Sequence, residues 1–251
     1  MIKLSIITVT YNNFLSLRKT YDSILELLGN VDYRWIVIDG GSSDKSVDFL
    51  NSIEKQGSVN DLIFISESDC GLYDAMNKGL EFVKLDSYVW FLNAGDLVGT
   101  NFFKISSIVQ TQTKLILGSS IRFDGKGKTF LKLPKLMSKI DKGMIAEHQS
   151  ILFYSDLLEK FKYDLSYKLS SDYDFVSRVI KSLSQTEVLI TDITFCKFEF
   201  GGVSYRKRNE ALLEDALIRI RVMKKSFPKA LLLLLQHFIW HKFKKIFRYI
   251  R

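Results

Sequence analysis

Cysteine and proline are scarce in this chain, which holds two of each among its 251 residues. Cys70 and Cys196 are too few for a disulfide framework, and neither lies in a spacing typical of a metal site or a thiol nucleophile. This cysteine usage fits a reduced compartment. The prolines, Pro134 and Pro228, mark no clear domain boundary before the C-terminal tail.

Two common phosphate-binding motifs are also absent. No G-x-G-x-x-G follows the first apolar segment, and no G-x-x-x-x-G-K-[ST] occurs in the sequence. We therefore expect neither a dinucleotide-dependent dehydrogenase nor a P-loop phosphotransferase. The N-terminal MIKLSIITVTYNN has a short, strand-like apolar stretch with no small-residue cleavage site, so no signal peptide is expected.

Acidic residues are missing from the end of the chain. The formal net charge is +8, and residues 216–251 contain ten Lys and Arg but no Asp or Glu. The rest of the chain is close to neutral. This distribution argues against a protein that binds nucleic acid through a generally basic surface, and it favours one localised anionic partner.

The first hundred residues alternate between strand-like and helix-like segments. β-branched apolar runs predict buried strands within 4–11, 33–44, 61–68 and 87–96. Helical spacing of apolar residues predicts helices within 12–28, 46–55 and 71–83. This order predicts an α/β fold with a mostly parallel sheet and helices on both faces. Further on, strands are expected within 115–125, 128–133 and 188–200, and a helix over 171–183.

Polar residues follow each of the four predicted strands. The carboxyl ends of parallel strands meet at one edge, where such folds bind ligands. A single polar loop would mean little, but four at one edge predict a binding site. Asp39 could accept a hydrogen bond from a ribose or a base there. A turn or capping role is the alternative, and it suits Ser42, Ser43 and Asp44 better than Asp39.

Five segments resemble, in this order, the family 2 glycosyltransferases, which are nucleotide-diphospho-sugar transferases with a GT-A fold. They are SIITVTYNN, VIDGGSSD, DCGLYDAMNKG, WFLNAGD and SDYDFVSR. The match spans roughly residues 1–205, and the subgroup it resembles makes bacterial surface polysaccharides. The resemblance implies a GT-A type, Rossmann-like, mostly parallel sheet flanked by helices.

The resemblance also implies roles for particular residues in binding a donor sugar. Thr8, Tyr11 and Asp39 match positions that hold the nucleoside of a UDP- or GDP-sugar. Further matches are Asp69 and Gly71 in the loop near the donor, Asn77 and Gly79 in an AxNxG helix motif, and Asn93 at the donor site. His148 and Gln149 resemble an HQ pair near the donor sugar or the acceptor.

The segment LNAGD aligns with the acidic LDADD of the family, which binds a metal ion. Asn93 and Gly95 replace two of the acids, so Asp96 is the remaining carboxylate ligand. One carboxylate, diphosphate oxygens and water still suit Mg²⁺, and Mn²⁺ is the other candidate.

Asp172 matches the acid of the family's ED motif, the proposed general base, with Ser171 in place of the glutamate. A carboxylate that takes the proton of an acceptor hydroxyl allows a one-step, inverting displacement. From the residues alone, SDYDF is more typical of helix capping, and Asp174 competes with Asp172 as the base.

The C-terminal tail is apolar and basic. Its apolar stretch, 230–240, is too short to span a bilayer. As a helix it carries an apolar stripe of Leu235, Ile239, Phe243, Ile246 and Ile250 and a roughly opposite face of His237, His241, Lys244, Arg248 and Arg251. We expect residues 229–251 to lie on an anionic membrane surface, rather than on nucleic acid. The alternative is a helix packed on the core with its basic face in solvent.

Together these features predict an inverting glycosyltransferase that moves a sugar from a nucleotide-diphosphate donor to a lipid-linked glycan acceptor. It would be cytoplasmic, on the inner face of the plasma membrane. The expected domains are a GT-A domain, 1–210, with a nucleotide-sugar half (1–100) and an acceptor half (101–210), and a helical tail, 211–251. The alternatives are a non-catalytic nucleotide-sugar-binding protein, which the reduced LNAGD segment keeps open, and a sugar-nucleotide pyrophosphorylase. The latter needs a Gly-rich loop with Arg and Lys where TYNNF stands.

Overall fold

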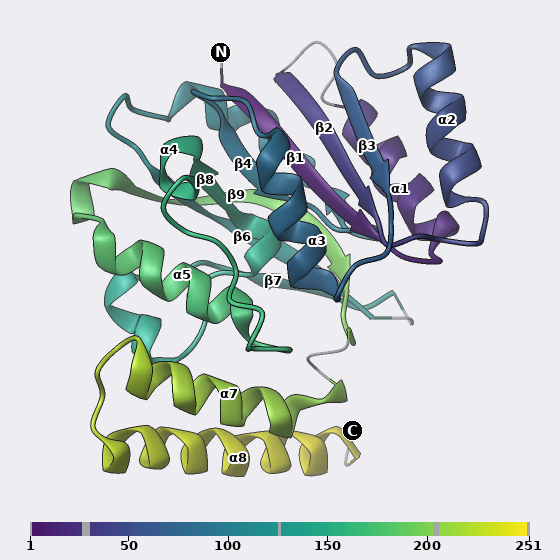
Figure 1. The fold of residues 1–251 in the computed structure, drawn as a ribbon. Coiled ribbons are helices and arrows are strands. Elements are labelled where there is room, and N and C mark those ends of the chain that lie inside the picture. The colour runs from purple at the N-terminus through teal and green to yellow at the C-terminus, as the bar shows by residue number, and fades with distance from the viewer. Residues whose placement is uncertain (1, 27–30, 125–126, 203–205, 250–251) are drawn as a thin grey trace.

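The computed structural model describes residues 2–26, 31–124, 127–202 and 206–249, with side chains described as far as His241 in the last helix. Across these residues one mixed sheet of nine strands runs through the structure (Figure 1), in the order β3-β2-β1-β4-β8-β6-β9-β5, with β7 paired to β6. The strands are β1 (Lys3–Thr10), β2 (Asp32–Asp39), β3 (Leu62–Ser66), β4 (Tyr88–Phe91), β5 (Leu97–Val98), β6 (Leu115–Phe123), β7 (Thr129–Lys132), β8 (Ile151–Tyr154) and β9 (Val188–Glu199).

Parallel pairing unites the first half of the sheet. β1 pairs in parallel with both β2 and β4, and β2 pairs in parallel with β3. The register places Thr10 beside Asp39 and Asp39 beside Ser66, so three strands end side by side. The second half is joined to it by β8, which runs antiparallel to β4.

Helices cover both faces of the sheet. They are α1 (Phe14–Leu25), α2 (Ser46–Gln56), α3 (Leu72–Gly79), α4 (Ser155–Leu158), α5 (Ser171–Ser182), α7 (Arg208–Arg221) and α8 (Phe227–Tyr249), with short 3-10 turns η1 (Leu80–Phe82), η2 (Phe102–Ser107), η3 (Met137–Lys142), η4 (His148–Ser150) and η5 (Gln185–Glu187). Figure 1 shows α1 and α2 on one face and α3 and α5 on the other.

The strands alternate their side chains between two apolar cores. On β1, Leu4 and Ile6 join the core under α1 and α2, whereas Ile7 and Val9 join the core under α3 and α5. Because side chains of a strand point to opposite faces in turn, a continuous apolar run is what a sheet covered on both faces requires. The predicted α/β fold is confirmed, and the domain boundaries stay a prediction.

Helices α7 and α8 pack side by side beneath the sheet (Figure 1). Helix α8 leaves its apolar stripe outside, since Leu235 and Ile239 are 50% and 55% exposed. The rest of the predicted stripe, from Phe243 on, lies outside the described side chains. His237, predicted on the polar face, is partly buried. Among the helices that the structure describes, none is both long and apolar enough to cross a bilayer.

Gly99 allows the short strand β5 to approach β9. Its N–H donates to the carbonyl of Phe195 at 2.7 Å, and a Cβ at this position would lie 1.9 Å from the carbonyl oxygen of Thr194. We expect Gly99→Ala to lower the free energy of unfolding by about 2–4 kcal/mol, because backbone must move to admit the methyl group. Gly202→Ala is the matched control, since no atom lies within 4 Å of its added Cβ. Urea titration measures both, and equal stabilities would contradict this account.

Candidate active site

The loop after β2 is organised by the carboxylate of Asp39. This side chain is fully buried. It accepts hydrogen bonds from the N–H of Ser42 at 2.8 Å, from the N–H of Gly41 at 3.2 Å and from the hydroxyl of Ser66 at 2.6 Å, and from the hydroxyl of Ser42 as well. Asp39 therefore has the turn role that the sequence assigned to its neighbours. Its predicted contact with a nucleoside stays a prediction.

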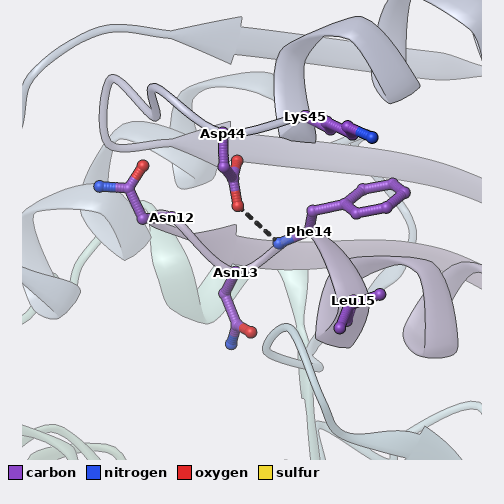
Figure 2. A pocket seen from close by; sticks show the side chains of 6 residues that line it. All are labelled: Asn12, Asn13, Phe14, Leu15, Asp44 and Lys45. Carbon is purple, nitrogen blue, oxygen red and sulfur yellow. Dashed lines mark hydrogen bonds between the residues drawn. The ribbon is translucent and has the colours of Figure 1, made fainter.

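The loops after β1 and β2 bind each other at the start of α1. Asp44 accepts from the N–H of Phe14 and from the N–H of Ser46, both at 2.9 Å, and Asn12 Oδ1 accepts from the N–H of Ser43 at 2.8 Å. Figure 2 shows Asp44 pointing at the backbone of Phe14. An open hollow of about 470 Å³ lies here, lined by Asn12, Asn13, Phe14, Leu15, Asp44 and Lys45. These bonds make the rim of the sheet edge a connected structure.

Tyr11 and Asp69 meet over Gly40. A Cβ on Gly40 would lie 2.7 Å from Asp69 Oδ2 and 3.2 Å from Tyr11 Cδ2, so these two side chains lie directly over the glycine and would have to shift to admit a larger residue. The Tyr11 side chain is 64% exposed, and Asp69 also accepts from the N–H of Gly71 at 2.8 Å. The structure therefore brings together Tyr11, Asp69 and Gly71, three of the residues expected at the donor edge.

Two other predicted donor-site residues are engaged inside the protein. Thr8 is buried; its hydroxyl donates to the carbonyl of Leu92 at 2.7 Å and accepts from Trp35 Nε1 at 2.9 Å. Asn77 makes two 2.9 Å hydrogen bonds with the backbone of Tyr163. This geometry gives both residues a structural role, and their predicted contacts with the donor stay untested.

The glycine of the AxNxG motif serves packing. A Cβ on Gly79 would lie 2.7 Å from Ile7 Cγ2, so the glycine lets α3 lie close against β1. Together with the Asn77 bonds, it fixes α3 between the sheet and the segment at Tyr163.

Asp96 is a buried carboxylate at the end of the β4 loop, with an 8% exposed side chain. Its Oδ2 accepts from the N–H of Asn93 at 3.0 Å. Burial raises the pKa of Asp96 to about 7, against the opposing hydrogen bonds from Asn93 and Gln149, and the charge of Glu147 raises it further. Gly95, at φ +102°, makes the turn that brings the carboxylate back over the strand end.

The oxygen atoms around Asp96 fit a hard divalent cation. Asn93 Oδ1 is buried and has no hydrogen-bond partner in the described structure, and Asp96 has no cationic side chain within ion-pair distance there. Carboxylate and amide oxygens are ligands that Mg²⁺ and Mn²⁺ accept. Within the described part of the chain, no three His, Cys, Asp or Glu side chains cluster as a metal site. A cation bound here would therefore need oxygens from a ligand or water.

Asp172 is the second helical residue of α5 and is partly buried. Its Oδ1 accepts from the N–H of Tyr173 at 2.8 Å and from the hydroxyl of Tyr73 at 3.3 Å. Burial raises the pKa of Asp172 to about 7; the two hydrogen bonds oppose this shift, and the charges of Asp215 and Glu147 add to it. This hydrogen bond comes from the next residue and is not a helix cap, and the N-cap residue of α5, Ser170, makes no side-chain capping bond. The carboxylate also lies beside Tyr73.

Asp174, the rival base, is engaged elsewhere. It is buried, and its Oδ2 lies 2.6 Å from Arg178 Nη2 in an ion pair along α5. No Lys or Arg in the described residues forms such a pair with Asp172. The geometry therefore favours Asp172 over Asp174 as a proton acceptor.

His148 lies behind the site. It is buried against Phe91, its Nε2 lies 2.7 Å from the Tyr163 hydroxyl, and burial lowers its pKa to about 4 despite the charge of Glu147. A neutral imidazole is therefore expected at pH 7. The neighbouring Gln149 hydrogen-bonds Asp96 through its side chain and accepts from Trp90 Nε1 at 2.8 Å through its carbonyl.

Glu147 is a site residue that the sequence reasoning missed. Its carboxylate pairs with Arg122 on β6 and Lys132 on β7, and its charge helps raise the pKa values of both Asp96 and Asp172. In the sequence it is only the residue before HQ. The two cations lie 25 and 15 residues earlier, and the β6–β7 hairpin brings them to it.

Comparisons with known proteins show which family and which fold this chain resembles. A family model described as Glycosyl transferase family 2 matches residues 5–163, more than half of the chain. The uncharacterized glycosyltransferase Rv1514c of Mycobacterium tuberculosis is 26% identical over 238 residues, which cover 89% of this chain and 85% of that protein. The PGL/p-HBAD biosynthesis glycosyltransferase Rv2957 of the same organism is 27% identical over 208 residues, or 80% and 78% of the two chains.

Solved structures show the same GT-A fold. Staphylococcus aureus TarS 1-349 in complex with UDP-GlcNAc superposes with a TM-score of 0.65 at 14% identity, covering 93% of this chain and 70% of that one. The mannosyltransferase PcManGT from Pyrobaculum calidifontis, in complex with GDP-Man and Mn²⁺, superposes with a TM-score of 0.64 at 12% identity, over 92% and 69% of the chains.

The buried charge of Asp96 predicts a pH-dependent stability. Its pKa rises from 3.8 to about 7 on folding, so the folded state binds more protons between these values. The free energy of unfolding should then fall as pH rises from about 4 to about 7. We compare the free energy of unfolding of Asp96→Asn with that of the wild type, both in the presence of a chelator. Between pH 4 and pH 8 this difference should change by up to about 4 kcal/mol in favour of the variant.

Urea titration at the two pH values measures this effect. Asp22→Asn, at an exposed position on α1, is the control and should follow the wild type. An Asp96→Asn variant with the same pH dependence as wild type would contradict the burial of an uncompensated charge.

Proposed function

This chain belongs to glycosyl transferase family 2, and we propose that it transfers one sugar, with inversion, from a nucleotide-diphosphate donor to a glycan acceptor. One observation carries the proposal. The pKa values of Asp96 and Asp172 are both raised to about 7, mainly by burial and further by the charge of Glu147. Neither carboxylate has a cationic partner among the described side chains. Such pairs of perturbed carboxylates are typical of sites that bind cations and move protons.

The donor would lie along the edge formed by Tyr11, Gly40 and Asp69. The exposed ring of Tyr11 offers a face to a base, and Asp69 lies next to this ring over Gly40. The solved relatives of the same fold were crystallised with UDP-GlcNAc and with GDP-Man and Mn²⁺. These complexes support a UDP- or GDP-sugar as the donor.

Asp96 and Asn93 Oδ1 would hold a divalent cation, Mg²⁺ or Mn²⁺, together with oxygens of the diphosphate. Such a cation stabilises the negative charge that builds on the leaving diphosphate. Gln149 and the N–H of Asn93 orient the Asp96 carboxylate for this contact.

Asp172 would act as the general base. Its carboxylate takes the proton of the acceptor hydroxyl while that oxygen attacks the anomeric carbon and the bond to the diphosphate breaks. The hydroxyl of Tyr73 and the N–H of Tyr173 both bind Oδ1, which holds the carboxylate in one orientation. A pKa near 7 suits a base that works near neutral pH. Because no enzyme nucleophile takes part, the configuration inverts.

The two alternatives lack this support. A non-catalytic sugar-nucleotide-binding protein has no need for a carboxylate with a pKa near 7 at Asp172. A pyrophosphorylase needs a Gly-rich loop with Arg and Lys after β1. In this chain Asn12 and Asn13 occupy that loop and line the hollow at the sheet edge.

We further propose a lipid-linked glycan acceptor and a peripheral position on the inner face of the plasma membrane. Exposed apolar residues on α8 support this proposal, among them Leu235, Ile239 and Trp240, which is 63% exposed. A helix packed on the core would bury its apolar stripe, whereas this stripe is exposed. An exposed apolar stripe is what a helix at the bilayer interface requires. In this arrangement residues 1–210 are the catalytic domain and 211–251 the membrane-facing tail.

Comparing Asp172→Asn with Asp174→Asn tests the base. We expect Asp172→Asn to lower kcat for transfer or donor hydrolysis by about 10²–10⁴-fold, because general-base catalysis typically contributes that much. Asp174→Asn, two residues away and ion-paired with Arg178, should keep kcat within about threefold even if it unfolds more easily. The assay uses UDP- and GDP-sugars with Mg²⁺ or Mn²⁺, and wild-type kcat should rise with pH up to about 7 as Asp172 loses its proton.

Two controls accompany this assay, and two results would contradict the proposal. Chelator and Asp96→Ala should each abolish turnover if the cation site is as proposed. Donor binding without turnover by the wild type, with a lipid-linked acceptor present, would favour the non-catalytic alternative. Equal losses in the two Asp→Asn variants would remove Asp172 from its proposed role.

Liposome sedimentation tests the α8 surface. We expect Leu235→Ser with Ile239→Ser to weaken binding to vesicles containing anionic phospholipid by about tenfold, since apolar side chains would no longer enter the interface. Leu85→Ser with Phe103→Ser is the matched control, because these side chains are also exposed, at 72% and 49%. Equal binding of the two double variants would rule out docking through this face of α8.

A further inference from the structure

A lysine-rich segment follows β6, and the function proposed above does not use it. Between Asp124 and Asp141 the sequence has five lysines and no acidic residue. This local excess of positive charge does not appear in the net charge of the first 215 residues, because acidic residues elsewhere balance it. We call residues 128–136, which contain β7 and the chain after it, the basic strap.

The basic strap exposes its large apolar side chains. Phe130 is 49% exposed, Leu131 62%, Leu133 54% and Leu136 63%. Neighbours on a strand point to opposite faces, so Phe130 and Leu131 are exposed on both sides of β7. β7 pairs with β6 and with no other strand that the structure describes. An apolar edge strand left in solvent invites aggregation, so a surface that covers it is expected.

The charges of the basic strap define what could cover it. Lys128 lies over the ring of Phe130, 5.2 Å from its centroid, and Lys135 is exposed. Lysines interleaved with leucines and an aromatic ring match a bilayer interface, where apolar groups enter and ammonium groups meet lipid phosphates. A protein partner with an apolar groove would leave these charges unmatched unless it were acidic as well.

The basic strap joins the two parts of the molecule that the membrane proposal concerns. In the middle of the strap, Lys132 pairs with Glu147, whose charge acts on Asp96 and Asp172. Beyond the C-terminal end of the strap, a Cβ on Gly143 would lie 3.9 Å from His237 Cε1 on α8, and the charge of Lys135 acts on the same imidazole. The exposed apolar residues of the strap and of α8 therefore belong to neighbouring elements.

We propose that the basic strap is a second membrane-docking surface, which binds anionic phospholipid headgroups through Lys128 and Lys135 and inserts Phe130, Leu131 and Leu133. With α8 it would define two contacts, and so set the orientation of the active-site edge on the bilayer. The proposal rests on the proposed membrane location, but vesicle binding tests it independently of sugar transfer.

The experiment uses the full chain and vesicles of phosphatidylcholine with or without phosphatidylglycerol. Lys128→Glu with Lys135→Glu should weaken binding to the anionic vesicles by about thirtyfold or more, since each basic residue at such a surface contributes about fivefold. Lys19→Glu with Lys55→Glu changes the net charge equally at exposed positions on α1 and α2, and should weaken binding by less than about threefold. Leu131→Ser with Leu133→Ser should weaken binding to both vesicle types, compared with Leu85→Ser and Phe103→Ser.

Each outcome decides the matter. Equal losses in the two Lys→Glu pairs, or unchanged binding of the Leu→Ser pair, would overturn the proposal. Sedimentation velocity tests the alternative that a second copy of this chain covers β7. A wild-type dimer that the strap substitutions convert to a monomer would show that β7 pairs with itself, and this result would also overturn the membrane proposal. Donor hydrolysis without vesicles should stay at the wild-type level in all strap variants, which separates failure here from failure of the proposed chemistry.

Discussion

The parallel register of β1 with its neighbours is the constraint on which the rest of the site depends. It places the ends of β1, β2 and β3 side by side, so that Thr10, Asp39 and Ser66 end at one level. The loops that leave this edge then bind one another, through Asp39 and Asp44. Donor-edge residues from three separate loops, Tyr11, Gly40 and Asp69, meet for the same reason. A shift of one residue in this register would turn the side chains at the strand ends to opposite faces.

The second feature of the site is a pair of buried carboxylates, Asp96 and Asp172, that have no cationic partner in the described structure. Asp96 and Asp172 come from elements 76 positions apart in the chain, and folding buries both near Glu147. Glu147 has two cationic partners, whereas the other two carboxylates have none in the described structure. Burial is the main cause of their raised pKa values, and the charge of Glu147 adds to it. A bound cation or a proton offsets the cost of these buried charges, and the proposed reaction uses one at each carboxylate.

Much of the fold was predictable from local pattern. The β-branched runs and the helical spacing of the first hundred residues predicted β1 to β4 and α1 to α3, and the structure has all seven. Residue roles were less predictable. Thr8 and Asn77 were expected at the donor, yet their side chains bind the core and the backbone of Tyr163. Sequence motifs report that a position is constrained, but a polar residue can be constrained by its neighbours in the fold as well as by a ligand.

The sequence by itself determined the α/β class, because this class depends on periodicity and on residues close together in the chain. The edge of the sheet expected to carry the site followed from the order of strands and helices, and the candidate carboxylates followed from the resemblance of short motifs to the family. Only the tertiary structure distinguishes Asp172 from Asp174, since it shows that Arg178 pairs with the carboxylate of Asp174. It also revealed Glu147 with Arg122 and Lys132, and the exposed apolar side chains of the basic strap. Burial and pairing arise from contacts between distant segments, and one strand's sequence does not record which strand will lie beside it.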